Sequence, residues 1–239
     1  MSSTINDVKA IVFDTFGTVV DWRGSILADL GAWGSGEGVN LDWAKLVDSW
    51  RERYNPQKAR VRSGELPWTN LDELHRESLR EVLGEMGAGD LTAHQIEHIN
   101  FVWHRLHGWD DAVGGLTRLK TKYIIGPLSN GNVALLVDMA KYAGLPWDHC
   151  FSVELFGHYK PDPETYLGVA KMLYLEPHQV MMCAAHNYDL AAARKCGLST
   201  AFIARPTEYG ASQTTDLAPD QEWDVIADDI NDLATRMGA

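Results

Sequence analysis

The sequence predicts an α/β fold with a doubly wound parallel sheet and a helical segment inserted after the first strand. Two observations carry this prediction. Short apolar runs alternate with helical patterns over the second half of the chain, which is typical of a parallel sheet covered by helices. About ninety residues between the first two runs have helical periodicity and almost no strand signal. The 239 residues suffice to bury a core of this kind.

Five short apolar runs are predicted to be buried strands, because each is bounded by polar or turn residues. They span residues 10–14, 122–130, 150–155, 180–185 and 200–205. Helical patterns separate the last four runs and span residues 132–144, 163–175 and 188–197. Two of these helices are expected to end at a glycine, which is a common stop signal.

The inserted segment contains three helical patterns, in which apolar residues recur at steps of three and four. They cover residues 41–54, 70–87 and 91–107. The glycine-rich stretch 31–38 follows no strand and lacks the GxGxxG spacing, so it predicts a surface loop and not a phosphate-binding loop.

An insertion at the carboxyl end of a strand would lie over the edge where α/β sheets bind ligands. We therefore expect residues 1–20 and 112–239 to form a Rossmann-like core, and residues 21–111 to form a helical cap over its site.

The composition narrows the class of partner. A formal net charge of −12 disfavours nucleic acid and anionic membranes as partners. No apolar run approaches the length of a membrane helix, and the N-terminus lacks a signal-peptide layout. Three cysteines without a CxxC pair make a disulfide framework unexpected, so we predict a cytoplasmic protein that acts on a small molecule.

Polar side chains follow four of the predicted strands. They are Asp14 and Thr18 after the first, Ser129 and Asn130 after the second, Lys160 after the third, and His186, Asn187 and Asp189 after the fourth. The carboxyl ends of parallel strands meet at one edge of a sheet, so these side chains should converge. Any one of them is compatible with an ordinary loop residue, but four strand ends together predict a functional site.

These four segments resemble the four motifs of the haloacid dehalogenase superfamily. DTFGT is similar to the first motif, LSNGN to the second, YKPDP to the third and AAHNYDLAAARKCG to the fourth. The pattern is most similar to the L-2-haloacid dehalogenase family. The resemblance covers essentially the whole chain, because the helical insertion is similar to the cap of that superfamily.

The resemblance implies hydrolysis of short L-2-haloalkanoic acids, such as haloacetates and 2-halopropionates, to 2-hydroxy acids. Asp14 would displace the halide, and water would then hydrolyse the aspartyl ester. No cofactor and no metal are implied, and the expected partners are the 2-haloacid and the halide ion. Members of this family commonly form homodimers, and the sequence itself carries no interface signal.

Phe16 separates this chain from the phosphatases of the superfamily. Those enzymes carry a second aspartate two residues after the nucleophile, which protonates the departing alcohol. A halide leaves as a stable anion, so an apolar ring suits dehalogenation and desolvates the carboxylate. The fourth motif offers one acid, Asp189, where phosphatases commonly place two Mg²⁺ ligands, which also argues against a metal.

The resemblance implies roles for the other candidate residues. Lys160 would keep Asp14 ionised and pair with Asp189. Arg51 would meet the leaving halide. Asn130 would be a second halide contact, and Ser129 with the backbone amides of Thr15 and Phe16 would hold the carboxylate. Tyr166 also falls at a family position, although a buried tyrosine on a helix is nearly as good an interpretation. Trp22 and Trp68 are candidates for the apolar pocket, but core or cap packing is the favoured role for both.

Two features of the sequence add to this assignment. Residues 50–62 contain five basic side chains, and apart from Arg51 we expect most of them to form a solvated face.

Many L-2-haloacid dehalogenases read Ser-Ser-Asn where this chain has Ala184-Ala185-His186. Two roles are therefore open for His186, a hydrogen-bond donor in place of the asparagine or a base toward water, and Asn187 is an alternative.

Three alternatives remain at the level of the sequence. HQIEH at 94–98 matches a short zinc-peptidase pattern and would place His94 and His98 on one helix face. A Mg²⁺-dependent small-molecule phosphatase with unusual acids is the second alternative. A non-catalytic scaffold that binds a small carboxylate is the third.

Overall fold

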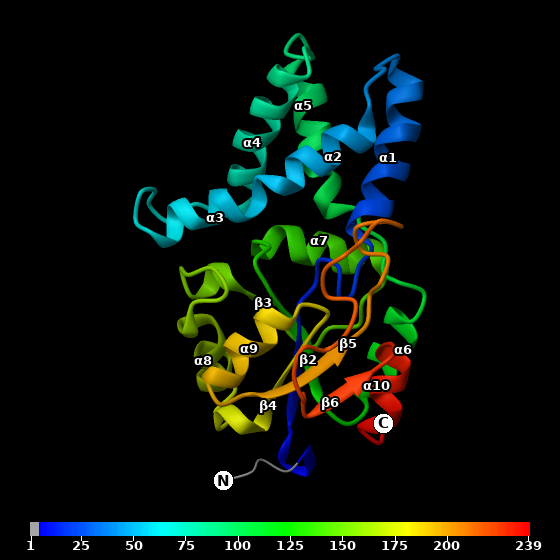
Figure 1. The fold of residues 1–239 in the computed structure, drawn as a ribbon. Coiled ribbons are helices and arrows are strands. Elements are labelled where there is room, and N and C mark those ends of the chain that lie inside the picture. Colours follow the sequence, from blue (N-terminus) through cyan, green and yellow to red (C-terminus); the bar gives the residue numbers. More distant parts are fainter. Residues whose placement is uncertain (1–4) are drawn as a thin grey trace.

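The computed structural model describes residues 5–239 and contains a six-stranded, all-parallel sheet (Figure 1). The strand order is β3-β2-β1-β4-β5-β6. The strands span Ala10–Phe13 (β1), Ile124–Ser129 (β2), Phe151–Ser152 (β3), Val180–Ala184 (β4), Ser199–Ile203 (β5) and Val225–Ala227 (β6). The predicted fold class is confirmed, and β1 lies at the centre between β2 and β4.

Two strands differ from the prediction. β3 has only two residues, because Val153–Leu155 forms a 3-10 helix (η3) whose start is capped by Ser152. The Ser152 hydroxyl accepts a hydrogen bond from the backbone N–H of Glu154 at 3.0 Å. The edge strand β6 was not predicted, because three residues are too few to form a recognisable apolar pattern.

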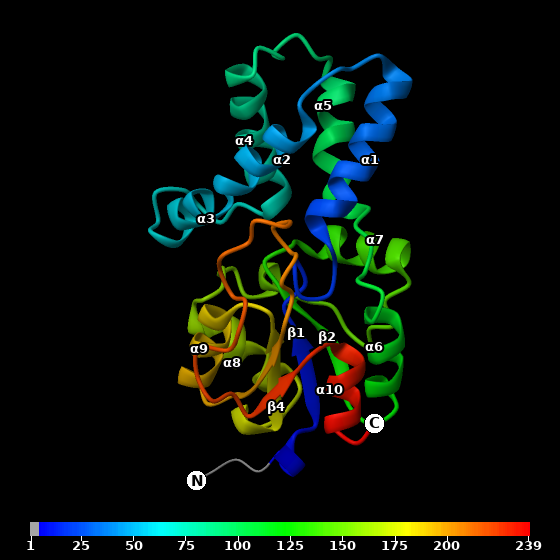
Figure 2. The same ribbon diagram turned by 45° about the vertical axis from the view of Figure 1, so that its right-hand side comes forward.

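Helices cover both faces of the sheet, as Figures 1 and 2 show. On one face lie α6 (Ala112–Lys120), α7 (Val133–Ala143) and α10 (Ile230–Arg236); on the other lie α8 (Pro163–Met172) and α9 (Asn187–Lys195). The alternation of strand side chains matches this arrangement. Ile11 and Phe13 pack with the first group of helices, whereas Ala10 and Val12 pack with the second.

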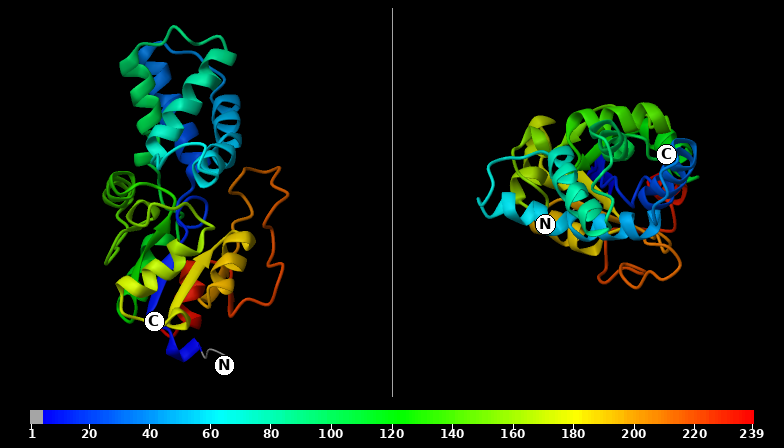
Figure 3. Two further views of the ribbon diagram at one scale, coloured as in Figure 1. Left: turned by 90° about the vertical axis from the view of Figure 1, so that its left-hand side faces the viewer. Right: turned by 90° about the horizontal axis from the view of Figure 1, so that it is seen from above.

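The segment after β1 is helical, as predicted. It contains α1 (Trp22–Glu37), α2 (Trp43–Glu52), α3 (Tyr54–Arg62), α4 (Leu71–Glu85), α5 (Ala93–Asn100) and the 3-10 helix η2 (Phe101–His104). These elements stand together above the carboxyl ends of the strands (Figure 3). Two short 3-10 helices, η1 (Ile5–Asp7) and η4 (Pro177–Gln179), precede β1 and β4.

The predicted surface loop at 31–38 is wrong, because α1 continues through this stretch to Glu37. Its Gly34 is buried where α1 meets the following segment. A Cβ added at this position would lie 2.5 Å from the ring of Trp43 and 2.7 Å from the carbonyl oxygen of Val39. The glycine therefore permits close packing inside a helix, a role that composition alone does not reveal.

One apolar cluster runs without a break from the sheet into the inserted helices. Trp103 lies at its middle, with ring centroids 5.6 Å from Phe16, 5.9 Å from Trp22 and 5.5 Å from Trp50. All four side chains are almost fully buried. Within the described part of the chain, no helix has the length and apolar character needed to cross a membrane.

Candidate active site

Asp14 follows β1 directly, and its carboxylate is almost fully buried. Oδ1 accepts a hydrogen bond from Lys160 Nζ at 3.0 Å. Oδ2 accepts from the Thr18 hydroxyl at 2.9 Å and lies 3.0 Å from His186 Nδ1. Burial opposes ionisation of Asp14, but Lys160 and His186 outweigh it and hold its pKa well below the ordinary range.

Lys160 bridges two carboxylates. Its ammonium group lies 3.0 Å from Asp14 and 2.5 Å from Asp189, and the second oxygen of Asp189 accepts from the Tyr166 hydroxyl at 2.5 Å. Burial disfavours the ammonium ion, but the two carboxylates raise the pKa of Lys160 above its ordinary value. The predicted Lys160–Asp189 contact is therefore present, and Tyr166 is joined to it as a donor.

Thr18 connects the ends of two strands. Its hydroxyl donates to Asp14 and accepts from the backbone N–H of Ala185 at 2.9 Å, at the end of β4. This hydroxyl therefore fixes the position of the carboxylate relative to the fourth motif.

Glu208 is a buried acid of the site that the sequence reasoning missed. Its carboxylate lies 2.9 Å from His186 Nε2 and accepts from Trp22 Nε1 at 3.0 Å. Glu208 belongs to the long loop after β5, which rises toward the start of α1 (Figure 1). A signal was available, because this loop also leaves the carboxyl edge of the sheet.

Gly17 makes room for Glu208. It has φ +86°, which favours glycine, and a Cβ at this position would lie 2.2 Å from the Glu208 carboxyl carbon. The glycine of the first motif is thus required both by its backbone conformation and by the buried acid beside it.

Arg51 lies in the inserted helices, between two aromatic rings. Its guanidinium carbon is 5.0 Å from the ring centroid of Trp22 and 4.1 Å from that of Tyr54. Its Nη1 is buried and has no hydrogen-bond partner within residues 5–239. Asn130 donates to the Tyr54 hydroxyl at 3.0 Å and accepts from the backbone N–H of Lys160 at 2.9 Å, so it joins α3 to the core.

Several polar groups of the first two motifs have few hydrogen-bond partners. The backbone N–H groups of Thr15 and Phe16 have no acceptor in the described part of the chain, and neither does the buried Thr15 hydroxyl. Ser129 is fully buried, and its hydroxyl oxygen accepts weakly from the N–H of Gly131 at 3.4 Å. Unpartnered buried donors are costly unless a ligand satisfies them.

Two predicted pocket residues lie elsewhere. Trp68 is 36% exposed and packs on Tyr159, with ring centroids 4.9 Å apart. Asn187 is bonded to the loop after β5: its amide donates to Asp216 at 2.9 Å and its carbonyl accepts from Trp223 Nε1 at 3.0 Å. Asn187 therefore anchors that loop and does not face Asp14.

Lys58 is an exception to the solvated basic face that was expected for most of residues 50–62. Lys58 is buried, and its ammonium nitrogen lies 4.1 Å from the ring centroid of Tyr54. Burial and the nearby Arg51 lower the pKa of Lys58 to about 7. The other basic residues pair with acids: Arg53 with Glu85, Arg60 with Glu65 and Glu77, and Arg62 with Asp162.

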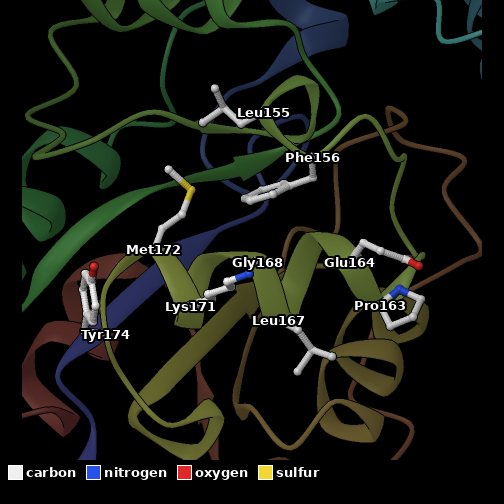
Figure 4. Close-up of a pocket in the computed structure, with 9 residues that line it drawn as sticks. All are labelled: Leu155, Phe156, Pro163, Glu164, Leu167, Gly168, Lys171, Met172 and Tyr174. Carbon is white, nitrogen blue, oxygen red and sulfur yellow. The ribbon is translucent and has the colours of Figure 1, made fainter.

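Two hollows lead toward the site between the inserted helices and the core, and Asn55 and Tyr188 border both. One, of about 330 Å³, reaches Lys160, and the other, of about 360 Å³, reaches Arg51. A larger hollow of about 720 Å³ lies along α8, and its lining residues, drawn in Figure 4, do not include Asp14. Its lining is mainly apolar and brings no reactive group together.

The zinc alternative gains no support from the geometry. Within residues 5–239, no group of three or more His, Cys, Asp or Glu side chains is arranged to hold a metal ion. His98 instead stacks on Trp33, with ring centroids 4.5 Å apart.

Comparisons with known proteins agree with the arrangement of the motifs. The model of the haloacid dehalogenase-like hydrolase family matches residues 8–197. The crystal structure of the L-2-haloacid dehalogenase PA0810 is 50% identical, with a TM-score of 0.95 over 97% of this chain and 99% of that one. The chain belongs to the L-2-haloacid dehalogenase family of these hydrolases.

Other L-2-haloacid dehalogenases are similar along almost the whole chain. The defluorinating enzyme Rha0230 is 47% identical, with a TM-score of 0.94 over 97% of this chain and 96% of that one. (S)-2-haloacid dehalogenase 4A from Burkholderia cepacia is 29% identical over 86% of this chain and 88% of its own length. This member of the family is thus an enzyme with the same layout as these relatives.

Proposed function

We propose that this enzyme hydrolyses short L-2-haloalkanoic acids, including haloacetates and 2-halopropionates, to 2-hydroxy acids with Asp14 as the nucleophile. One observation carries the proposal. The buried Asp14 carboxylate is held ionised by Lys160, and the residue two positions later is Phe16, which has no proton to give. A halide leaves without a proton, whereas an alkoxide does not. The names of its relatives support the same reaction.

Oδ1 of Asp14 is the better placed oxygen for the displacement. It accepts one hydrogen bond, from Lys160, whereas Oδ2 accepts from Thr18 and faces His186. A lone pair on Oδ1 is therefore free to attack the carbon that bears the halogen. Backside attack inverts that carbon, so an L-2-haloacid gives a D-2-hydroxy acid.

The unpartnered donors have complementary roles in the proposal. The N–H groups of Thr15 and Phe16, together with Ser129, would bind the substrate carboxylate. The Nη1 of Arg51 would receive the leaving halide, with Asn130 nearby. The unpartnered Nη1 would give a departing fluoride a charge-assisted hydrogen bond, so we include fluoroacetate among the proposed substrates, and the defluorinating relative supports this choice.

We propose that residues 21–111 act as a cap that closes over the substrate. Arg51 comes from these residues and Asp14 from the core, so the halide and the nucleophile meet only when both parts are together. The Tyr54–Asn130 hydrogen bond would hold this arrangement.

Halide release tests the proposal directly. Purified enzyme is incubated with L- or D-2-chloropropionate and with fluoroacetate, in the presence of EDTA. We expect halide and D-lactate from the L substrate, halide from fluoroacetate, and no loss of rate with EDTA. An inactive Asp14→Asn variant serves as the control.

Labelled water tests the ester intermediate. In a single turnover in H₂¹⁸O, the hydroxy acid should carry unlabelled oxygen and Asp14 should acquire the label. Halide release from no 2-haloacid would contradict the proposed function. Release of phosphate from esters with Mg²⁺ would instead support the phosphatase alternative, and substrate binding without turnover would support the scaffold.

A further inference from the structure

His186 lies between two carboxylates, one of which is the proposed nucleophile. Its Nδ1 is 3.0 Å from Asp14 Oδ2, and its Nε2 is 2.9 Å from Glu208 Oε2. The imidazole and Glu208 are both buried. Burial disfavours the charged ring, but Glu208 and Asp14 outweigh it and raise the pKa of His186 well above its ordinary value. The free enzyme therefore holds an imidazolium ion with both N–H groups donated.

Glu208 is held rigidly against this ring. Trp22 Nε1 donates to its other oxygen at 3.0 Å, and Gly17 leaves the space that its carboxyl group fills. Among residues 5–239, further ionisable groups lie close by: the ring centroid of Tyr188 is 5.7 Å from that of the imidazole, and Lys160 binds the other oxygen of Asp14. Glu208 thus fixes the orientation of the ring by accepting a hydrogen bond from Nε2–H, so that Nδ1 is directed at Asp14.

Alkylation of Asp14 changes the charge next to His186. The ester carries no charge, so His186 loses one of the two anions that keep it protonated. Its proton can then leave to solvent, which accounts for the one proton that hydrolysis of a carbon–halogen bond releases. The ring that remains is neutral, with Nε2–H donated to Glu208 and a free lone pair on Nδ1 beside the ester.

We propose that His186, positioned by Glu208, is the general base that activates water in the second half-reaction. This inference rests on the proposed aspartyl-ester route. It goes beyond the sequence, which leaves two roles open for His186 and does not place Glu208 beside it.

The proton transfers of the step balance. Water attacks the Asp14 carbonyl carbon and gives one proton to His186 Nδ1, and the oxyanion forms on Oδ2, which accepts from Thr18. The bond from the carbonyl carbon to Oδ1 then breaks. The departing alkoxide takes a proton from Lys160, which lies 3.0 Å from Oδ1. The second proton of the water passes from the regenerated carboxyl group to the Lys160 amine, and the resting charges return.

Intact-protein mass spectrometry with halide detection tests whether His186 is needed for hydrolysis of the ester and not for displacement of the halide. His186→Asn is mixed with L-2-chloropropionate, and the wild type and the exposed-residue control His107→Asn are run beside it. We expect the His186 variant to release one halide per enzyme in a burst, and then to turn over about 10²–10⁴-fold more slowly. The mass should show an alkyl adduct on Asp14 that hydroxylamine removes, whereas the wild type and the control accumulate none.

Glu208→Gln tests the positioning role with a readout that a purely structural role would not change. The rate of ester hydrolysis in a single turnover should rise with pH as His186 loses its proton. Without the Glu208 carboxylate the pKa of His186 falls, so this rise should move to lower pH. The variant also serves if His186→Asn fails to fold.

The outcomes separate the two proposals. A wild-type enzyme that releases no halide contradicts the proposed function. A folded His186→Asn enzyme that turns over at the wild-type rate without an adduct overturns the role of His186. The same holds if this variant releases no halide while the wild type does. A pH profile of Glu208→Gln that coincides with the wild-type profile removes Glu208 from the proposal.

Discussion

Replacing Lys160 with methionine should destabilise the fold by about 3–5 kcal/mol near pH 6, because a buried ion pair loses one partner. Lys160 Nζ lies 3.0 Å from Asp14 and 2.5 Å from Asp189, and all three residues are buried. Methionine has a similar shape and fills the space. The two carboxylates would then face each other without the cation between them.

The cost should shrink as the pH falls. In the variant, the two carboxylates would share a proton, with a folded-state pKa above the unfolded value of about 3.9. A carboxyl group whose folded-state pKa is raised binds its proton more tightly in the folded protein. The free energy of unfolding of the variant therefore increases as the pH drops through that raised pKa. In the wild type the pKa of Asp14 is depressed, so its contribution is kept until the pH falls below about 3.9. From about pH 6 to about pH 4.5, the difference in the free energy of unfolding between the wild type and Lys160→Met should fall by about 2 kcal/mol.

Urea denaturation, followed by tryptophan fluorescence across this pH range, measures the difference. Lys120→Met is the matched control, since Lys120 pairs with Asp148 at 2.9 Å with side chains 41% and 34% exposed. We expect the control to cost less than about 1 kcal/mol at every pH. A cost for Lys160→Met that does not change with pH, or that equals that of the control, would refute the reasoning.

Three further substitutions test individual contacts. Thr18→Val should cost about 1–3 kcal/mol in urea denaturation and slow halide release, because it leaves a buried N–H unsatisfied, and Thr18→Ser should restore both. Gly17→Ala should cost more than Gly64→Ala, because both have positive φ but only Gly17 lies against Glu208; equal losses would contradict this account. Arg51→Leu should lower kcat for chloroacetate about 10²–10³-fold, and Arg51→Lys should recover only part of it, which a chloride assay measures.

Much of the core could be predicted from the sequence, since strands buried on both faces form apolar runs that end at polar residues. Asp14, Thr18, Lys160 and Asp189 were expected to converge for this reason, and a chain of hydrogen bonds runs from Thr18 to Asp14, from Asp14 to Lys160 and from Lys160 to Asp189. The helical character of the insertion was also evident from its periodicity. The edge strand Val225–Ala227 was too short to form a pattern.

Other features depend on which loops meet in space. Glu208 stands among polar residues in a loop, and nothing in its neighbours indicates that it is fully buried beside His186. The helix through residues 31–37 was missed because its glycines weaken the helical signal, while tertiary packing against Trp43 decides the outcome. The sequence could not decide between a pocket role and a packing role for Trp68, because its contact with Tyr159 is visible only in the fold.

The unbroken apolar cluster around Trp103 limits how freely the helical insertion can be exchanged between related enzymes. The insertion appears in the sequence as a module that recombination could transfer between relatives. Its Trp103 ring, however, is packed against Phe16 of the core, two residues after the nucleophile. A transplanted cap would therefore arrive without the core partner that Trp103 fits. Chimeras that carry over Phe16 with the cap should keep one cooperative unfolding transition, whereas chimeras joined at the segment boundary should show two.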